Sequence, residues 1–241
     1  MPSCAVRTDR FGSGSGSVPR HRLSAPDGSG ATVIELGAAV TEVLVPDREG
    51  RCANVTLAHR APDGYRTNRA YLGAVVGRTA GRIGGARYRL GDRSVALPEN
   101  EGPNHLHGGP DGWHARRWRT VATGSDARSA WVEAVLDSPD GDQGHPGRAE
   151  ALVRYEWTVG HELHVRIRVR ADAPSLANPT HHATWNLAGE GRGTVHDHRL
   201  SVAADAVAEA APDLVATGRR FAVAGTPFDL RRPRPIGSVA P

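Results

Sequence analysis

The sequence has no lysine, only two cysteines, and no long run of apolar residues. All 30 basic residues are arginines, scattered along a chain whose formal net charge is only +4, so an isoelectric point near 9.7 does not indicate a nucleic-acid partner. Cys4 and Cys52 are too few for a disulfide framework. No apolar stretch could span a membrane, and Met1–Arg22 lacks the apolar core of a secretory signal. We therefore expect a cytoplasmic protein with neither a nucleic-acid nor a membrane partner.

Composition favours a turn-rich, all-β protein. Hydrophobic residues make up 39% of the 241 residues, and 29 glycines and 17 prolines supply many turns. Residues 1–30 are rich in glycine, serine and arginine and contain the linker-like repeat Gly12–Ser17. We expect residues 1–30 to be a disordered or loosely attached arm, and residues 31–241 to form one β-sandwich domain.

Several segments have strand or turn patterns. The clearest is a pair of alternating runs, in which every second residue from Val153 to Val159 and from Leu163 to Val169 is apolar and Gly160-His161 joins the runs. This pattern predicts two long antiparallel strands, each with one buried and one wet face, so the arginines of the second run indicate a solvated face. Other expected elements are strands at Ala31–Leu36, Ala39–Val45 and Tyr71–Val76, a turn at Pro46–Gly50, a hairpin over Ala86–Leu97 turning at Gly91-Asp92, and a helical turn or two over Asp205–Ala211.

Three polar clusters interrupt these strands. In Gly77–Ile83, glycines would let the backbone approach a ligand and two arginines could supply forked donors to its oxygens. The second cluster is Asn100–Gly109, where His105 and His107 at i and i+2 would share a strand face. The third is Asn178–Gly189.

The third cluster holds two adjacent histidines. If it is extended, His182, Thr184 and Asn186 share one side while His181, Ala183 and Trp185 share the other. One histidine would then face a site as an acid, a base or a metal ligand, while its neighbour points away. Taken alone, the segment fits a hydrogen-bonded core histidine better than a site residue.

The chain resembles the aldose 1-epimerases, or galactose mutarotases, from about Thr32 to its end. The segments that carry the resemblance occur in the order found in that family: Gly77–Ile83, Asn104–Gly109 with Gly112 and Trp118, Asn178–Gly189, and Gly225–Arg231. The resemblance implies a galactose-mutarotase-like antiparallel β-sandwich (a supersandwich), incomplete at the C-terminus, with an open sugar cleft. It also implies interconversion of the α and β anomers of an aldohexose, such as glucose or galactose, without a cofactor.

The resemblance assigns roles to particular residues. His182 matches the family's general acid, and His107 matches the histidine that contacts the sugar near its ring oxygen, so these two are the expected catalytic residues. Arg82 matches the arginine that binds sugar hydroxyls. Gly81, which stands where the family usually has asparagine, and Thr184 complete the expected substrate-binding set with His107 and His182. Trp113 and Trp185 replace common phenylalanines and would keep an apolar surface for a sugar face.

The resemblance also implies missing parts. In the family, the counterpart of Phe228–Arg231 is followed by a substrate-binding aspartate and, much later, by the glutamate that acts as base. This chain stops at Pro241. We therefore expect little or no activity, and poor solubility because strand edges would be uncovered.

Two alternatives stay open. One is a non-catalytic carbohydrate-binding module of the same fold that keeps Arg82, His107 and His182. The other is a metal-dependent enzyme that uses His105, His107 and His182, although no carboxylate stands at a fitting spacing; we expect no metal.

Overall fold

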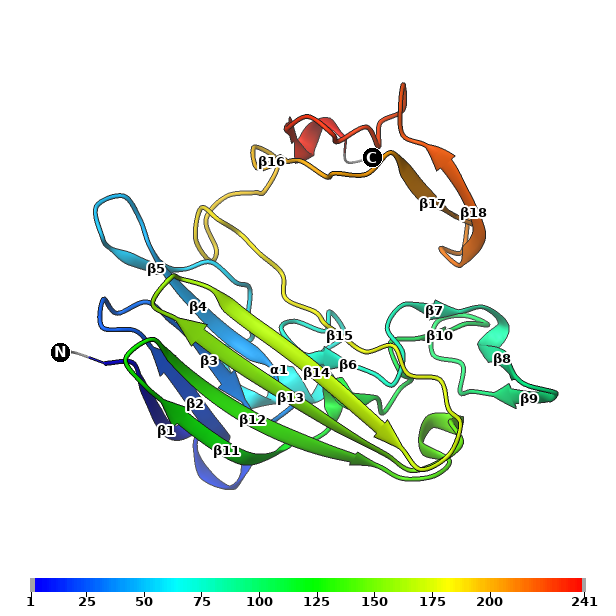
Figure 1. The fold of residues 1–241 in the computed structure, drawn as a ribbon, viewed down its shortest axis with the longest axis horizontal. Helices are drawn as coiled ribbons and strands as arrows, with labels where there is room; N and C mark the ends of the chain where they lie inside the picture. Colours follow the sequence, from blue (N-terminus) through cyan, green and yellow to red (C-terminus); the bar gives the residue numbers. More distant parts are fainter. Residues whose placement is uncertain (1–2, 240–241) are drawn as a thin grey trace. The chain divides into compact units, whose positions relative to one another are not determined.

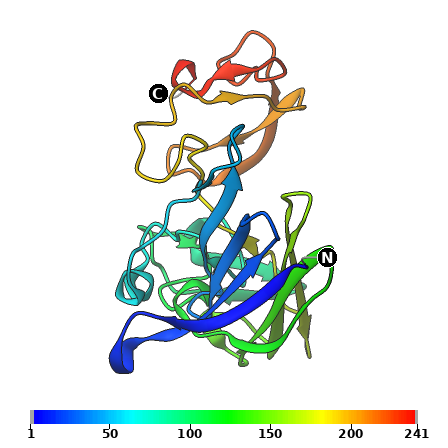
Figure 2. The ribbon, with the colours of Figure 1, turned by 90° about the vertical axis from the view of Figure 1, so that its left-hand side faces the viewer.

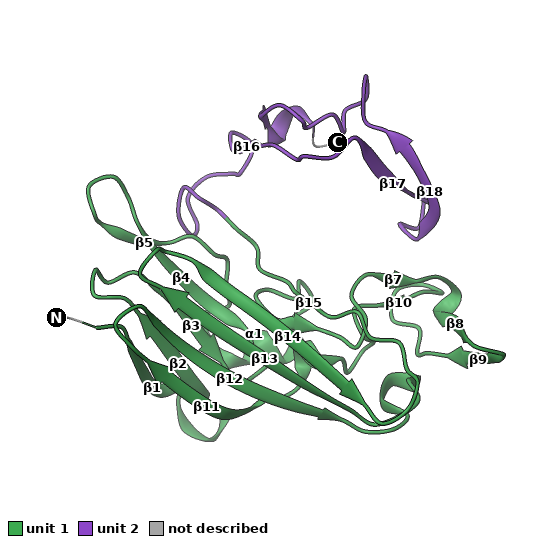
Figure 3. Ribbon diagram, in the orientation of Figure 1, with its two compact units in different colours: residues 1–185 green, residues 186–241 purple. Residues whose placement is uncertain are grey.

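The structure, a computed structural model, describes residues 3–239, and the chain divides between Trp185 and Asn186 into two compact units (Figure 3). Regular structure in the described residues is almost entirely β-strand, and all the paired strands are antiparallel. No helix of this part of the chain is long and apolar enough to cross a membrane.

The first unit begins with a five-stranded sheet in which sequential strands are neighbours. The strands are β1 Ala5–Phe11, β2 Val18–Ser24, β3 Gly30–Ile34, β4 Val40–Pro46 and β5 Cys52–Asn54. The expected strands at Ala31–Leu36 and Ala39–Val45 correspond to β3 and β4. They are joined through Gly37 and Ala38, whose positive φ angles of 67° and 46° make the tight turn.

The expectation of a disordered arm over residues 1–30 differs from the structure. Residues 1–2 lie outside the described part, but β1 and β2 are strands paired over seven residues each, and the Gly12–Ser17 repeat is the loop of their hairpin. Leu23 is 1% exposed and belongs to the main core. The error arose because most side chains of β1 face water, so its sequence carries little apolar alternation.

A second sheet has four strands in the order β11-β12-β13-β14. Their bounds are β11 Arg119–Ser125, β12 Ser129–Ser138, β13 Ala149–Thr158 and β14 Leu163–Ala171. The predicted long hairpin is confirmed: β13 and β14 pair in one continuous register with Val153 opposite Ile167. Val153, Tyr155 and Trp157 are buried, and the apolar residues of β14 are half-buried between exposed arginines, as expected. Val159, in contrast, lies beyond the end of β13 and is exposed.

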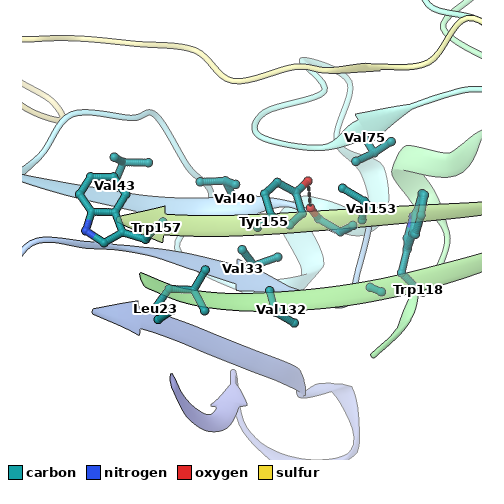
Figure 4. Packing of buried hydrophobic residues seen from close by; sticks show 14 of the residues in the cluster. Leu23, Val33, Val40, Val43, Val75, Trp118, Val132, Val153, Tyr155 and Trp157 are labelled. Carbon is teal, nitrogen blue, oxygen red and sulfur yellow. Dashed lines mark hydrogen bonds between the residues drawn. The ribbon is translucent and has the colours of Figure 1, made fainter. Parts of the chain in front are cut away.

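The two sheets form a sandwich around one apolar core. Figure 4 shows Leu23, Val33, Val40 and Val43 of the first sheet against Val132, Val153, Tyr155 and Trp157 of the second. The hydroxyl of Tyr155 donates to the carbonyl of Ala38 at 2.7 Å, so the one polar atom of this buried ring is satisfied. At the sandwich's side β1 lies beside β11 (Figures 1 and 2), and the amide of Cys4 donates to the carbonyl of Asp126. The expected all-β sandwich is thus confirmed.

Short elements cover one end of the sandwich. They are α1 Pro62–Thr67, β6 Val75–Val76, β7 Arg82–Ile83, β8 Arg87–Leu90, β9 Arg93–Ala96, β10 His105–Leu106 and β15 Thr180–His181, with 3-10 turns at Gly14–Gly16, Gly84–Ala86, Trp113–Ala115 and Asp142–Gly144. The predicted hairpin over Ala86–Leu97 is confirmed by the β8–β9 pair, with Gly91-Asp92 between the strands. Of the expected strand Tyr71–Val76, only Val75–Val76 is a strand, although Ala74 is as fully buried as these valines.

The second unit contains short paired strands. They are β16 Arg199–Leu200, β17 Ala206–Ala210, β18 Ala216–Ala222 and β19 Arg234–Pro235, with a 3-10 turn at Ile236–Ser238. The expectation of a helical turn over Asp205–Ala211 is wrong, because this stretch is β17 in a hairpin with β18. Alanine-rich composition favoured a helix, whereas the partner strand decided the conformation.

Candidate active site

The first part of the site is the pair β6–β15, which fixes the two adjacent histidines. His181 lies opposite Val75, and the amide of His182 donates to the carbonyl of Ala74 at 2.9 Å. Because the backbone is extended here, the two imidazoles point to opposite sides. His181 packs against Tyr155 with ring centroids 5.6 Å apart, and burial lowers its pKa to about 4. His182 packs instead against His107 and Tyr71, so the predicted division of the two histidines is confirmed.

The second part is the pair β7–β10, which places His107. The amide of His107 donates to the carbonyl of Gly81, and the amide of Gly81 donates to Nδ1 of His107, both at 3.1 Å. Since Nδ1 accepts this bond, the proton of the neutral ring sits on Nε2. Gly81 has a φ of 74°, a left-handed conformation that asparagine tolerates but most residues do not.

The rings of His107 and His182 meet edge to face, with centroids 5.2 Å apart. Burial is the main cause that lowers the pKa of His107 to about 4, and the nearby His182 and Arg82 lower it further. His107 is therefore neutral near pH 7 and offers its Nε2–H as a hydrogen-bond donor. Nδ1 of His182 is buried and has no hydrogen-bond partner among the described residues. The pair can hold one positive charge far more easily than two.

A carboxylate and an arginine stand next to this pair. Arg82 donates from Nε and Nη2 to the two carboxylate oxygens of Glu101, and the side chains are 23% and 36% exposed. Both charges act on His107, the arginine lowering its pKa and the glutamate raising it. Arg82 is thus held in one orientation close to the imidazoles, with part of its surface open to solvent.

Tyr71 and His114 complete the cluster, and the sequence reasoning assigned neither to a site. The Tyr71 ring lies 4.7 Å from that of His107, 5.7 Å from that of His182 and 4.6 Å from that of His114. Burial raises the pKa of Tyr71 and lowers that of His114 to about 4. In the sequence Tyr71 begins an apolar run, so it was expected to be a strand residue. In the structure its φ is 55°, which departs from strand geometry, and no sequence pattern indicated this.

Other expected site residues lie elsewhere. The backbone carbonyl of Thr184 accepts hydrogen bonds from the amide of Leu57 and the hydroxyl of Thr56. A contact of the Thr184 side chain with a sugar stays a prediction. Trp113 is 1% exposed and packs on Trp118, so it presents no surface to a sugar. Trp185 is 44% exposed.

In the Gly77–Ile83 cluster, some residues pack within the fold and others lie at the candidate site. A side chain at Gly77 would collide with the Trp113 ring, so this glycine serves close packing rather than a ligand. Arg78 is 2% exposed and donates to oxygens of Ser138, Pro139, Pro146, Gly147 and Ser175. It therefore clamps the loop after β12, and only Arg82 is placed near the imidazoles.

The expected common face of His105 and His107 is wrong. His107 has a φ of 52°, which breaks the strand alternation. His105 is fully buried, bonds through Nδ1 to the carbonyl of Pro98 at 2.8 Å, and packs on His145, with ring centroids 5.9 Å apart. Over residues 3–239, no group of three or more His, Cys, Asp or Glu side chains is placed to hold a metal ion.

Comparison with known proteins relates these features to one family. The family model described as aldose 1-epimerase matches residues 19–240. Mouse galactose mutarotase is 36% identical over 226 residues, covering 94% of this chain and 64% of the mouse protein. The aldose 1-epimerase of Escherichia coli (strain K12) is 34% identical over 207 residues, covering 86% of this chain and 58% of that protein.

Solved structures give the same result. The galactose 1-epimerase of Lactobacillus acidophilus superposes with a TM-score of 0.87 at 28% identity, covering 98% of this chain and 68% of that one. An aldose epimerase homologue from C. elegans gives a TM-score of 0.82 at 27% identity, covering 98% and 67%. The chain spans 64% of the length of the mouse relative and has the fold of these structures. On the family match and the relatives above 30% identity, the chain belongs to the aldose 1-epimerase family.

Proposed function

We propose that this chain acts on the anomeric centre of an aldohexose such as glucose or galactose, as a mutarotase. The observation that carries the proposal is the edge contact of His107 and His182 at 5.2 Å, with the oriented Arg82 beside them, in a chain of this family. The relatives named above are a galactose mutarotase, an aldose 1-epimerase and a galactose 1-epimerase.

The chemistry is a ring opening followed by reclosure. The C1–O5 bond breaks, its electron pair stays on O5, and O5 takes a proton from a general acid. A base removes the proton of the C1 hydroxyl, and those electrons form the C=O bond of the open aldehyde. Rotation about the C1–C2 bond and reclosure give the other anomer. No electrons leave the sugar, so the reaction needs no redox cofactor.

In this site His182 is the proposed acid. His107 stays neutral near pH 7, because burial lowers its pKa to about 4. A protonated His182 would therefore not be repelled by a second positive charge on His107. Its Nε2–H can donate to a sugar oxygen. The partly exposed guanidinium of Arg82 can donate to hydroxyls, although it shares its donors with Glu101.

A second candidate is a non-catalytic sugar-binding module. The geometry of Glu101 favours this candidate. Glu101 is the carboxylate that raises the pKa of His107, and both of its oxygens already accept hydrogen bonds from Arg82. A carboxylate engaged in this way is poorly placed to receive the C1 hydroxyl proton. The module would bind a hexose without accelerating its mutarotation.

Polarimetry or NMR of freshly dissolved α-glucose and α-galactose decides between the two. For the enzyme, we expect mutarotation faster than the buffer rate, and His182→Ala should reduce the acceleration by roughly 10²- to 10⁴-fold, the usual contribution of a positioned acid. His164→Ala is the matched control, since His164 lies on β14 and bonds to the exposed Glu162. Saturable sugar binding by calorimetry without acceleration would support the module. The cytoplasmic location stays a prediction, which cell fractionation would test.

A further inference from the structure

A cavity of about 410 Å³ opens beside Tyr71, between the end of α1 and the loop before Ala115. Its walls include Arg66, Arg69, Asn100, Tyr71 and His114. A cavity of this size is in the range of small-molecule sites and is much larger than a single inorganic ion needs. None of its lining side chains belongs to the catalytic pair His107 and His182.

The charge of the cavity wall is positive. Two arginines line it, and no lining residue in the described part of the chain is an aspartate or glutamate. Arg66 is partly engaged, since it lies 3.5 Å from Asp63 and donates to the carbonyl of Gly16. Arg69 is exposed and makes no ion pair within residues 3–239. Forked guanidinium donors are well suited to the oxygens of a phosphate group.

The inner wall carries a buried imidazole as well. His114 is 8% exposed, and its Nδ1 has no hydrogen-bond partner among the described residues. Its ring lies 4.6 Å from that of Tyr71, whose ring is also 4.7 Å from that of His107. Tyr71 is therefore a wall common to the cavity and to the imidazole pair. A molecule with an anionic group and a sugar-sized body could contact both.

We propose that this cavity is a second binding site, and that it takes a phosphate group between Arg66 and Arg69 with His114 in the inner wall. The phosphate can come from free inorganic phosphate or from a phosphorylated monosaccharide whose sugar extends toward Tyr71. The site does not require the proposed epimerase activity, because phosphate binding depends on the charges and shape of the cavity alone.

The test is a titration of the full chain at low ionic strength with inorganic phosphate, and separately with hexose 6-phosphate. Calorimetry gives the affinity, and the imidazole ¹H–¹⁵N signals of His114 report the location. We expect saturable binding that shifts the His114 signals. Arg69→Ala should weaken it about tenfold, the value of one charge-assisted bond, and Arg66→Ala/Arg69→Ala should abolish it. Arg168→Ala, an exposed arginine of β14, is the control and should bind like the unchanged chain.

The two titrations also distinguish the two possible origins of the phosphate group. Hexose 6-phosphate binding at least tenfold tighter than inorganic phosphate identifies a sugar phosphate, whereas equal affinities identify the free ion. The proposal is overturned if neither ligand saturates, if Arg69→Ala binds as tightly as the unchanged chain, or if the His114 signals stay fixed during a saturable titration. Because the readout is binding, failure here leaves the mutarotation proposal standing, and an inactive protein leaves this one standing.

Discussion

Some residues of this chain have side chains buried in contacts within the fold and others line the candidate site, and residues close together in sequence can belong to different groups. Arg78 and Arg82 stand four positions apart in one glycine-rich segment. The first is 2% exposed and bonds to loop oxygens, while the second is bonded to the partly exposed Glu101 beside two imidazoles. Residue type alone could not distinguish them, because both are arginines in the same kind of segment.

Arg78 gives a direct test of this division. Replacing it with alanine would leave several buried carbonyl oxygens without a donor, so we expect Arg78→Ala to lower the free energy of unfolding by about 3–5 kcal/mol. Urea denaturation followed by circular dichroism measures the change. Arg168→Ala, at an exposed position, should change it by less than about 0.5 kcal/mol. Equal effects of the two substitutions would show that the buried bonds do not stabilise the loop.

Elements were predictable where local pattern and partner strand agree. The β13–β14 hairpin and the β8–β9 hairpin follow from alternation and turn residues, and both are present. His181 and His182 divide as alternation requires. By contrast, Asp205–Ala211 has a composition that fits a helix, and only its pairing with β18 makes it a strand. His105 and His107 do not share a face because of the positive φ at His107.

The site was predictable only in part for the same reason. Family motifs singled out His107, His182 and Arg82, which the structure brings together with Tyr71. Tyr71 and His114 join the cluster through tertiary packing, since their neighbours in space are distant in sequence. No spacing rule within one segment could have found them.

The hairpin β1–β2 is the element whose prediction failed most clearly, and it makes a testable claim. Leu23 is 1% exposed between the two sheets, so Leu23→Ala should destabilise the first unit by about 2–5 kcal/mol. Arg7→Ala, at an exposed position of β1, is the matched control and should have little effect. Thermal or urea unfolding measures both. A Leu23→Ala variant as stable as the control would return this segment to the role of a loosely attached arm.

The two units differ as wholes in how much apolar surface they bury. The first has a core that includes Trp113, Trp118, Tyr155 and Trp157, each at most 1% exposed. In the second, every residue of β18 is exposed, and Phe221 and Phe228 are 38% and 54% exposed. Because burial supplies the main driving force for folding, the first unit holds most of the chain's stability, and its titratable groups determine how that stability varies with pH.

Between about pH 4 and pH 6.5 the groups that matter most are buried histidines. Burial lowers the pKa of His107, His114, His145 and His181 to about 4, from an ordinary value of 6.5. Between these values the unfolded chain binds more protons than the folded one. Stability is therefore complete above about pH 6.5 and falls as the pH drops toward 4, by up to about 1.4 kcal/mol per pH unit for each such histidine.

His145 offers the sharpest test of this pH dependence, since it is fully buried, packs on His105 and lies outside the imidazole pair. Urea denaturation at pH 7.5, 6.0 and 5.0 should show a steep loss of stability, and His145→Gln should flatten the slope by about one proton, because the unfolded glutamine takes no charge. His164→Gln, at a partly exposed position of β14, is the matched control. The prediction is wrong if stability depends on pH as steeply in His145→Gln as in the unchanged chain. Protonation of another group would then cause the loss of stability.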